Sequence, residues 1–132
     1  MEQLNWLAII VAALGSFLLG GPWYSKPLFG AMWNREAGQS KPAGSGHPAR
    51  VFGLSFVFSL IAATAFAWLL GPNPQLMRAL CMGLVVGACF VATSFGINYQ
   101  FANRSTLLWL IDAGYHIAQF VVFGLVLGLW PR

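Results

Sequence analysis

The fold is decided by the last apolar run, Thr106–Trp130, which has the sequence TLLWLIDAGYHIAQFVVFGLVLGLW. At about 1.5 Å per residue, a helix over this run can cross the ~30 Å hydrocarbon core of a bilayer. A rotation of about 100° per residue gathers its polar side chains on one arc. They are Asp112, Tyr115, His116 and Gln119. Because a carboxylate and an imidazole are costly at membrane depth, we expect this arc to face the protein interior.

The overall composition indicates a membrane protein. Of the 132 residues, 58% are hydrophobic and 8% are charged, whereas an ordinary soluble domain has about 25% charged residues. Seven Lys and Arg against three acids give a net charge of +4. These basic residues lie in connections and at span ends, not in a stripe, so we expect the lipid bilayer as the partner and not nucleic acid.

Four apolar runs predict an all-α fold, a transmembrane four-helix bundle in a single domain over residues 1–132. The predicted spans cover about residues 4–21, 51–71, 75–101 and 106–130. Pro22 is expected to end the first span, because proline has no N–H for the helical ladder. The apolar spacing in residues 27–37 predicts a short amphipathic helix at the membrane interface, with an aromatic-anchored loop as the alternative. The Gly-, Ser- and Pro-rich residues 38–50 predict a mobile loop.

Small residues recur at every fourth position in the predicted spans, which lets helices approach closely. These helix-packing candidates are Ala8, Ala12, Ser16 and Gly20, then Ser55, Ser59 and Ala63, and the pairs Gly83/Gly87 and Gly124/Gly128. We expect the two glycine pairs to be shared between chains, and hence a homo-oligomer. Aromatic residues near span ends are expected to anchor the helices at the membrane interface. They are Trp23, Tyr24, Trp33 and Trp130.

Further polar residues are predicted to converge on the end of the bundle that holds Asp112. They are Ser94 and Asn98 on the third span, with Lys26 and Arg50 in the first connection. Two interpretations are open. In a structural network, Asp112 pairs with Arg50 or Lys26 or accepts from Ser94, while His116 stays neutral. In a ligand or proton site, Asp112 and His116 share a proton, since histidine titrates near neutrality.

The basic residues also predict an orientation. Five lie on the side of the first and third connections, Lys26, Arg35, Lys41, Arg50 and Arg104, and two lie on the other side, Arg78 and Arg132. Since cytoplasmic loops carry an excess of Lys and Arg, the connection over residues 22–50 is predicted to be cytoplasmic, with both termini outside.

Several short motifs resemble one bacterial membrane family. They are Asn5-Trp6-Leu7-Ala8, then Trp23-Tyr24-Ser25 followed by Leu28-Phe29-Gly30 and Trp33, then Asp112-Ala113-Gly114-Tyr115-His116, and the ending Gly128-Leu129-Trp130. This pattern is similar to the family described as domain of unknown function 1761. The resemblance implies a small four-span protein of the bacterial inner membrane with no assigned activity.

Three classes of function are therefore open. The first is an oligomer that binds or passes an ion or small solute at Asp112 and His116. The second is a structural or accessory protein that binds partner helices, and the third is a membrane enzyme. We expect no enzyme, because a lone potential base, His116, does not make a catalytic site. Cys81 and Cys89 lie about 12 Å apart along one predicted helix, too far for a disulfide, and no metal-ligand spacing is present. We expect no metal or cofactor, and we favour solute binding slightly over scaffolding, with the ligand unknown.

Overall fold

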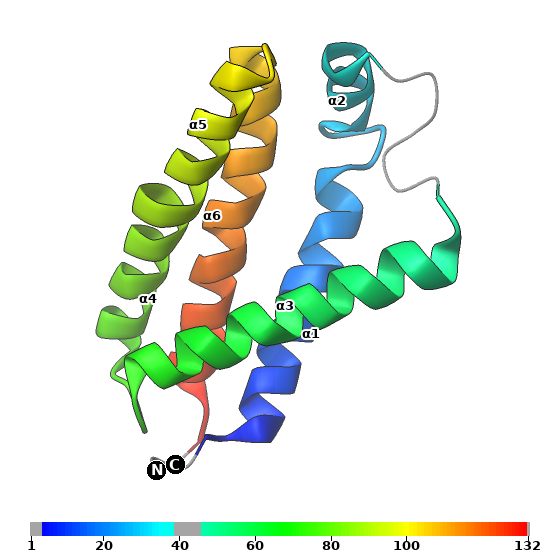
Figure 1. Ribbon diagram of the computed structural model, residues 1–132. Coiled ribbons are helices and arrows are strands. Elements are labelled where there is room, and N and C mark those ends of the chain that lie inside the picture. The colour runs from blue at the N-terminus through cyan, green and yellow to red at the C-terminus, as the bar shows by residue number, and fades with distance from the viewer. Residues whose placement is uncertain (1–3, 39–45, 132) are drawn as a thin grey trace.

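The computed structural model describes residues 4–38 and 46–131, and in this part all the regular structure is helical (Figure 1). The elements are α1 (Trp6–Trp23), α2 (Gly30–Ala37), α3 (Pro48–Leu70), α4 (Leu76–Val85), the π-helical segment η1 (Val86–Val91), α5 (Ala92–Phe101) and α6 (Thr106–Leu129). Four helices are long and apolar enough to cross a membrane: α1, α3, the continuous helix formed by α4, η1 and α5, and α6. The predicted all-α, four-span fold is confirmed.

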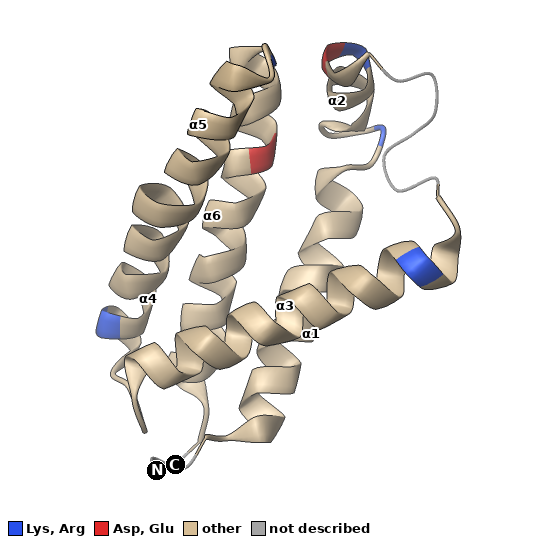
Figure 2. Ribbon diagram, in the orientation of Figure 1, with Lys and Arg blue, Asp and Glu red and all other residues tan. Residues whose placement is uncertain are grey.

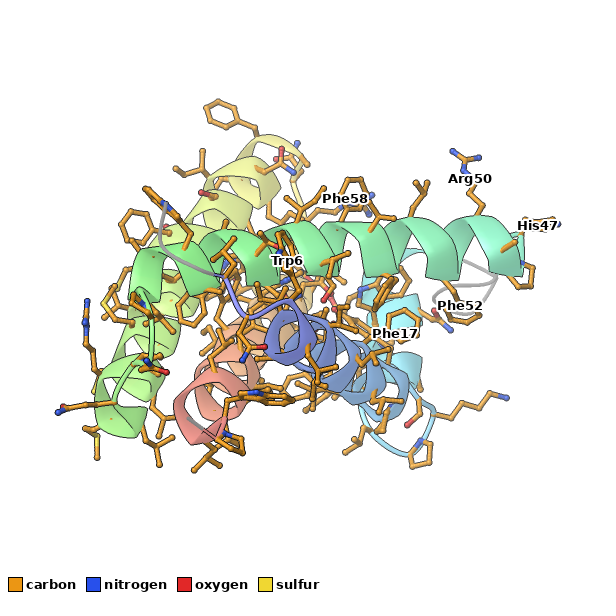
Figure 3. All side chains as sticks on the ribbon, turned by 90° about the horizontal axis from the view of Figure 1, so that it is seen from below. Trp6, Phe17, His47, Arg50, Phe52 and Phe58 are labelled. Carbon is orange, nitrogen blue, oxygen red and sulfur yellow. The ribbon has the colours of Figure 1, made fainter. Side chains whose placement is uncertain are left out.

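Helix α6 lies at the centre of the bundle, with α1 on one side and the α4–η1–α5 helix on the other (Figure 1). Helix α3 crosses over α1, and its first turns extend beyond the other helices (Figure 3). The two ends of the chain lie together at one end of the bundle. Helix α2 and the turn between α5 and α6 lie at the opposite end (Figure 1).

Three helix boundaries differ from the predictions. Pro22 lies inside the last turn of α1, because a proline removes only its own N–H. The next N–H groups still close the helix, as Tyr24 N–H does on the Gly20 carbonyl at 3.2 Å. Helix α2 begins at Gly30, later than predicted. Helix α3 begins at Pro48, so residues 48–50 are helical. Proline suits the first turn of a helix, where its N–H would be unpaired. Residues 39–45 of the predicted loop lie outside the described residues.

The core forms where α1, α3 and α6 meet. Side chains of Ala8, Ala12 and Ala13 are fully buried and let the neighbouring helices approach α1. Larger rings fill the space between α3 and α6, where Phe66 lies 5.7 Å from Phe120 between ring centroids. The predicted stripes of α1 and α3 therefore pack inside the chain, with Ser16, Ser59 and Ala63 also buried.

Ser55 is the exception in the predicted stripe of α3, because it is exposed. A four-residue repeat drifts by about 40° per step around a helix. A stripe with that period cannot face one neighbour along a whole helix. Ser55 therefore makes no buried contact within the described part of the chain, and its helix-packing role stays a prediction.

Each of the two glycine pairs packs against the backbone of the facing helix within one chain. A Cβ atom added at Gly83 would lie 2.4 Å from the Phe120 carbonyl oxygen, and one at Gly124 would lie 2.4 Å from that of Ala79. Added Cβ atoms at Gly87 and Gly128 would meet the backbone of α6 and α4 at 2.7 and 2.8 Å. The prediction that these faces are shared between chains is wrong, because α4–η1 and α6 already occupy them.

The third membrane span, formed by α4, η1 and α5, contains a π-helical segment, η1, that was not predicted from the sequence. Such segments widen a helix locally and often occur at functional sites. Just after it, the Trp109 Nε1–H of α6 donates to the Ala92 carbonyl at 2.8 Å. Thr93 Oγ1 donates to the Cys89 carbonyl at 2.8 Å, so side-chain donors supplement the backbone bonds of this region.

Candidate functional site

The site is built around Asp112, the single acidic residue of α6 (red on that helix in Figure 2). Its side chain is buried, with the residue 7% exposed. The Tyr24 hydroxyl donates to Oδ1 at 2.6 Å and Trp33 Nε1–H donates to the same oxygen at 3.0 Å. The Tyr99 hydroxyl donates to Oδ2 at 2.5 Å. These four residues form what we name the Asp112 network, and they connect the exit of α1 with α2, α5 and α6.

A tight turn between α1 and α2 places two of the donors. The Phe29 N–H donates to the Trp23 carbonyl at 3.2 Å, and the Gly30 N–H donates to the Ser25 carbonyl at 2.9 Å. A Cβ atom at Gly30 would lie 2.4 Å from the Tyr24 carbonyl oxygen, so the turn needs glycine there. The reversed chain sets the rings of Tyr24 and Trp33 edge to face, 6.2 Å apart. Both then reach the same carboxylate oxygen.

The donors to Asp112 are all neutral. Burial raises the pKa of the Tyr24 phenol, and its hydrogen bond to Asp112 raises that pKa further. Tyr24 therefore keeps its proton and stays a donor. A carboxylate accepts about four hydrogen bonds, so three donors nearly saturate it. Among the described residues, the ion pair present is Arg35 with Glu36 at 3.7 Å, and it lies outside the network.

Two further bonds hold α1 against α6 next to the network. Trp23 Nε1–H donates to the Ile111 carbonyl at 3.0 Å, and the Tyr115 hydroxyl donates to the Ser16 carbonyl at 3.1 Å. The Tyr115 ring lies beside Gly20, where an added Cβ would be at van der Waals distance, 3.4 Å, from its hydroxyl oxygen. Aromatic side chains with a polar group at the tip thus hydrogen-bond the C-terminal half of α1 to α6.

His116 and Gln119 form a separate pair on the same arc. Nδ1 of His116 lies 2.9 Å from Oε1 of Gln119, which places the imidazole proton on Nδ1 because the amide oxygen accepts. The imidazole stacks on Phe95 with ring centroids 4.8 Å apart. Asp112 and His116 have different hydrogen-bond partners, so the structure does not join them through one shared proton.

Four predicted site residues lie away from Asp112. Lys26, Arg50, Ser94 and Asn98 are exposed. The Ser94 hydroxyl donates to the Phe90 carbonyl of its own helix at 2.7 Å, as short hydroxyl side chains in helices often do. Arg50 lies at the far end of α3 and points away from the bundle (Figure 3). The predicted pairing of Asp112 with Arg50, Lys26 or Ser94 is wrong, because α3 crosses the bundle and neutral aromatic donors fill the space.

The residues that replace them were missed as ligands of the carboxylate. The sequence pattern predicts interface anchoring for Tyr24, Trp33 and Trp23, and it predicts no role for Tyr99. All three predicted anchors in this region donate hydrogen bonds into the bundle. The signal in the sequence was a buried acid in a chain rich in aromatic residues with N–H or O–H groups, which seek partners when buried. Trp130, at the end of α6, is partly buried against the core.

Cavities lie elsewhere in the described structure. One of about 400 Å³ lies where the chain ends meet, between Leu4, Trp68 and Trp130. A groove of about 370 Å³ lies beside the turn between α5 and α6, with Tyr99 in its wall. Asp112 and His116 line neither one. Among the described residues, no group of three His, Cys, Asp or Glu side chains is placed to hold a metal ion.

Comparison with known proteins gives one match. No curated protein and no solved structure is found to be similar. A family model described as "Protein of unknown function (DUF1761)" matches residues 7–128. The match covers α2, every member of the Asp112 network and the four spans except for one terminal residue each of α1 and α6. The chain therefore belongs to the DUF1761 family.

Proposed function

We propose that this multi-pass membrane protein is a structural or accessory scaffold, in which the Asp112 network holds helix α2 against the end of the transmembrane bundle. The observation that carries the proposal is the set of three donors on one carboxylate. They come from the α1 exit, α2 and α5, and they meet on α6. One side chain therefore fixes the relative positions of four elements.

The network is closed, which favours scaffolding over solute binding. Asp112 has both carboxylate oxygens occupied, and neither of the two cavities is lined by it. The rings of Tyr24, Trp33 and Tyr115 pack against one another around it. A solute would have to displace at least one donor to reach the carboxylate, which would leave that donor without its partner.

A second candidate function, binding or passage of a cation or proton, rests on a different observation. Asp112 lies inside a membrane-spanning helix, yet its donors among the described residues are all neutral. An ionised carboxylate without a counter-charge is costly in that setting. A bound cation, or a proton, would offset that cost, and several copies of the chain would then be needed to build a path.

Replacement of Asp112 with Asn separates the two proposals. Asn keeps an oxygen for Tyr24 and Trp33, and its amide can donate to Tyr99, whose hydroxyl rotates. The scaffold proposal predicts that Asp112→Asn costs little stability, because each of the three donors keeps a hydrogen-bond partner on the amide. Asp112→Ala is the matched control, because it leaves three donors without an acceptor and should cost several times more.

The readouts are thermal unfolding in detergent and proton or cation flux into vesicles that contain the purified protein. The scaffold proposal predicts no flux above that of empty vesicles for either protein. Flux through the parent protein that disappears in Asp112→Asn, with unfolding unchanged, would replace scaffolding with the second function. Equal destabilisation by Asn and Ala would contradict the scaffold proposal, since it would show that the charge itself holds the fold.

We propose a bacterial inner membrane as the location, with α2 on the cytoplasmic side and both termini outside. Lys26, Arg35 and Arg104 belong to the α2 end of the bundle, and Arg78 belongs to the opposite end (Figure 2). Lys41 and Arg132, which also entered the count, lie outside the described residues. The excess of basic residues at the α2 end supports this orientation.

Labelling of single cysteines tests the orientation. Ala31→Cys and Gln75→Cys are introduced into a protein that lacks Cys81 and Cys89, since both native thiols are exposed. Ala31 and Gln75 are exposed residues at opposite ends of the bundle. A membrane-impermeant thiol reagent applied to intact cells should label Gln75→Cys and spare Ala31→Cys. Labelling of Ala31→Cys from outside would reverse the proposed orientation.

Self-association is also proposed, but on a surface other than the glycine faces. The first turns of α3 extend beyond the other helices, and its N-terminal half exposes Phe52 and Phe58 (Figure 3). Cross-linking in membranes and sedimentation in detergent test this proposal. Both should give a dimer or larger species that Phe58→Ala weakens. A protein that is monomeric at every concentration would contradict self-association.

A further inference from the structure

The groove between α5 and α6 changes from apolar to polar along its length. Gly96, Ile97 and Trp109 line its apolar part. Trp109 is fixed as a wall because its Nε1–H donates to the Ala92 carbonyl at 2.8 Å. Gly96 lets the Trp109 ring lie close to α5, since an added Cβ would lie 3.3 Å from Trp109 Nε1. The groove is therefore a formed surface feature with one rigid aromatic side.

The polar part of the groove is at the end of the membrane spans. Gln100, Arg104 and Thr106 line it, where α5 ends and α6 begins. Next to it, Ile97 and Phe101 are exposed, at 64% and 87%. Exposed apolar side chains at the end of a span are suited to contact with lipid. The apolar part of the groove therefore faces acyl chains, and the polar part lies at headgroup depth.

Arg104 supplies a positive charge at the polar part. Its Nη1 donates to the Ala37 carbonyl, the last carbonyl of α2, at 3.1 Å. A guanidinium has five N–H donors, so this bond leaves several directed elsewhere. Among the described residues, Glu36 pairs with Arg35 and Arg104 takes part in no ion pair. The charge of Arg104 is therefore available to an anion from outside the chain.

We infer that the groove binds one anionic phospholipid of the surrounding bilayer. Its phosphate lies on Arg104, because guanidinium and phosphate form strong charge-assisted hydrogen bonds. One acyl chain lies along Ile97 and Trp109. Charge complementarity selects an anionic headgroup, and the apolar part of the groove selects a lipid over a free phosphate. Tyr99 lines this groove and also donates to Asp112, so the bound lipid adjoins the Asp112 network.

Native mass spectrometry of delipidated protein tests this site. Phosphatidylglycerol, phosphatidylcholine with the same chains, and inorganic phosphate are each added to the intact protein in nonionic detergent. We expect one phosphatidylglycerol to stay bound, with at least tenfold preference over phosphatidylcholine and no competition by phosphate. Equal retention of the two lipids, or full competition by phosphate, would overturn the inference.

Three variants assign the binding to the groove. Arg104→Gln should lower phosphatidylglycerol retention at least tenfold, and Arg78→Gln, an exposed arginine at the other end of the bundle, should leave it unchanged. Trp33→Phe removes one bond of α2 to the bundle but keeps Arg104, so it should retain the lipid. Loss of lipid in Trp33→Phe equal to that in Arg104→Gln would show that release of α2 is the cause. Equal behaviour of the two arginine variants would overturn the inference as well.

Discussion

The two sides of helix α6 are held to their neighbours in opposite ways. Toward α4, the two backbones are in direct contact, because Gly83 and Gly124 have no side chain to keep them apart. Toward α1 and α2, contact is made by large side chains, the rings of Tyr24 and Trp33 on the Asp112 carboxylate. One interface has no room for an added methyl group. The interface of α6 with α1 and α2 depends on donors placed within hydrogen-bonding distance of the Asp112 carboxylate.

This difference predicts how each side responds to mutation. Where lipid is as apolar as the protein, helices associate mainly through close van der Waals contact. That contact is lost as soon as an atom is inserted. A hydrogen-bonded network, in contrast, tolerates a change that keeps shape and bonding capacity, and fails when a donor or acceptor is left alone.

The largest effect is expected from an added methyl group at the glycine interface. Gly124→Ala places a Cβ 2.4 Å from the Ala79 carbonyl oxygen, so α4 and α6 must separate. Overpacking of this kind costs about 1–3 kcal/mol, sometimes more. Gly53→Ala in α3 is the control, since an added Cβ there meets no atom within 4 Å. It should be neutral or slightly stabilising, because alanine favours helix by about 1 kcal/mol over glycine.

Unfolding in detergent followed by circular dichroism measures both changes. We expect opposite signs for the two variants. If Gly124→Ala unfolds like Gly53→Ala, the two backbones are not in contact and the description of this interface fails.

A smaller effect is expected from the loss of one donor on the other side of α6. Trp33→Phe keeps most of the ring but removes the N–H that donates to Asp112. A typical hydrogen bond contributes about 0.5–1.5 kcal/mol, and Tyr24 and Tyr99 still donate to the carboxylate, so the cost should stay below that of Gly124→Ala. The loss should be local, so hydrogen exchange should quicken in α2 and stay unchanged in α4 and α6.

Trp68→Phe is the matched control for this change. Trp68 is 69% exposed on α3, so its replacement should leave exchange in α2 as it is. Faster exchange throughout the chain in Trp33→Phe would mean that the network stabilises the whole bundle instead of α2 alone.

The parts of the fold that follow from local physics could be predicted. Span lengths follow from apolar length alone, and Asp112 had to be buried because of the cost of its charge in lipid. The burial of Ala8, Ala12 and Ser16 followed from their spacing. These features depend on residues near one another in the chain, so a single sequence contains the information.

The parts that depend on distant residues could not be predicted. The sequence does not say that α3 crosses the bundle, so Arg50 was wrongly placed beside Asp112. It also does not show which glycine faces meet, because Gly-xxx-Gly supports contact within one chain as well as between chains. Trp33 was recognised as aromatic and interfacial, but the direction of its N–H follows from the turn at Gly30. Hydrogen-bond partners are decided by tertiary position.

The smallest effect is expected where close packing and hydrogen bonding occur together, at the contact of α1 with α3. Ser16 Oγ and Ser59 Oγ lie 2.7 Å apart, and each hydroxyl also reaches the Ala13 carbonyl, at 3.0 and 3.3 Å. Ser→Ala removes a bond without adding volume, and Ala13 keeps its backbone bonds. A double-mutant cycle of Ser16→Ala and Ser59→Ala should give a coupling of about 0.6 kcal/mol, with about 1.7 kcal/mol as the upper bound for such pairs in membranes. Ser55→Ala, at an exposed position of the same stripe, should show no coupling to Ser16→Ala. A larger coupling would mean that this contact depends on its polar atoms, as the Asp112 side of α6 does. No coupling would mean that it depends on small size alone, as the glycine side does.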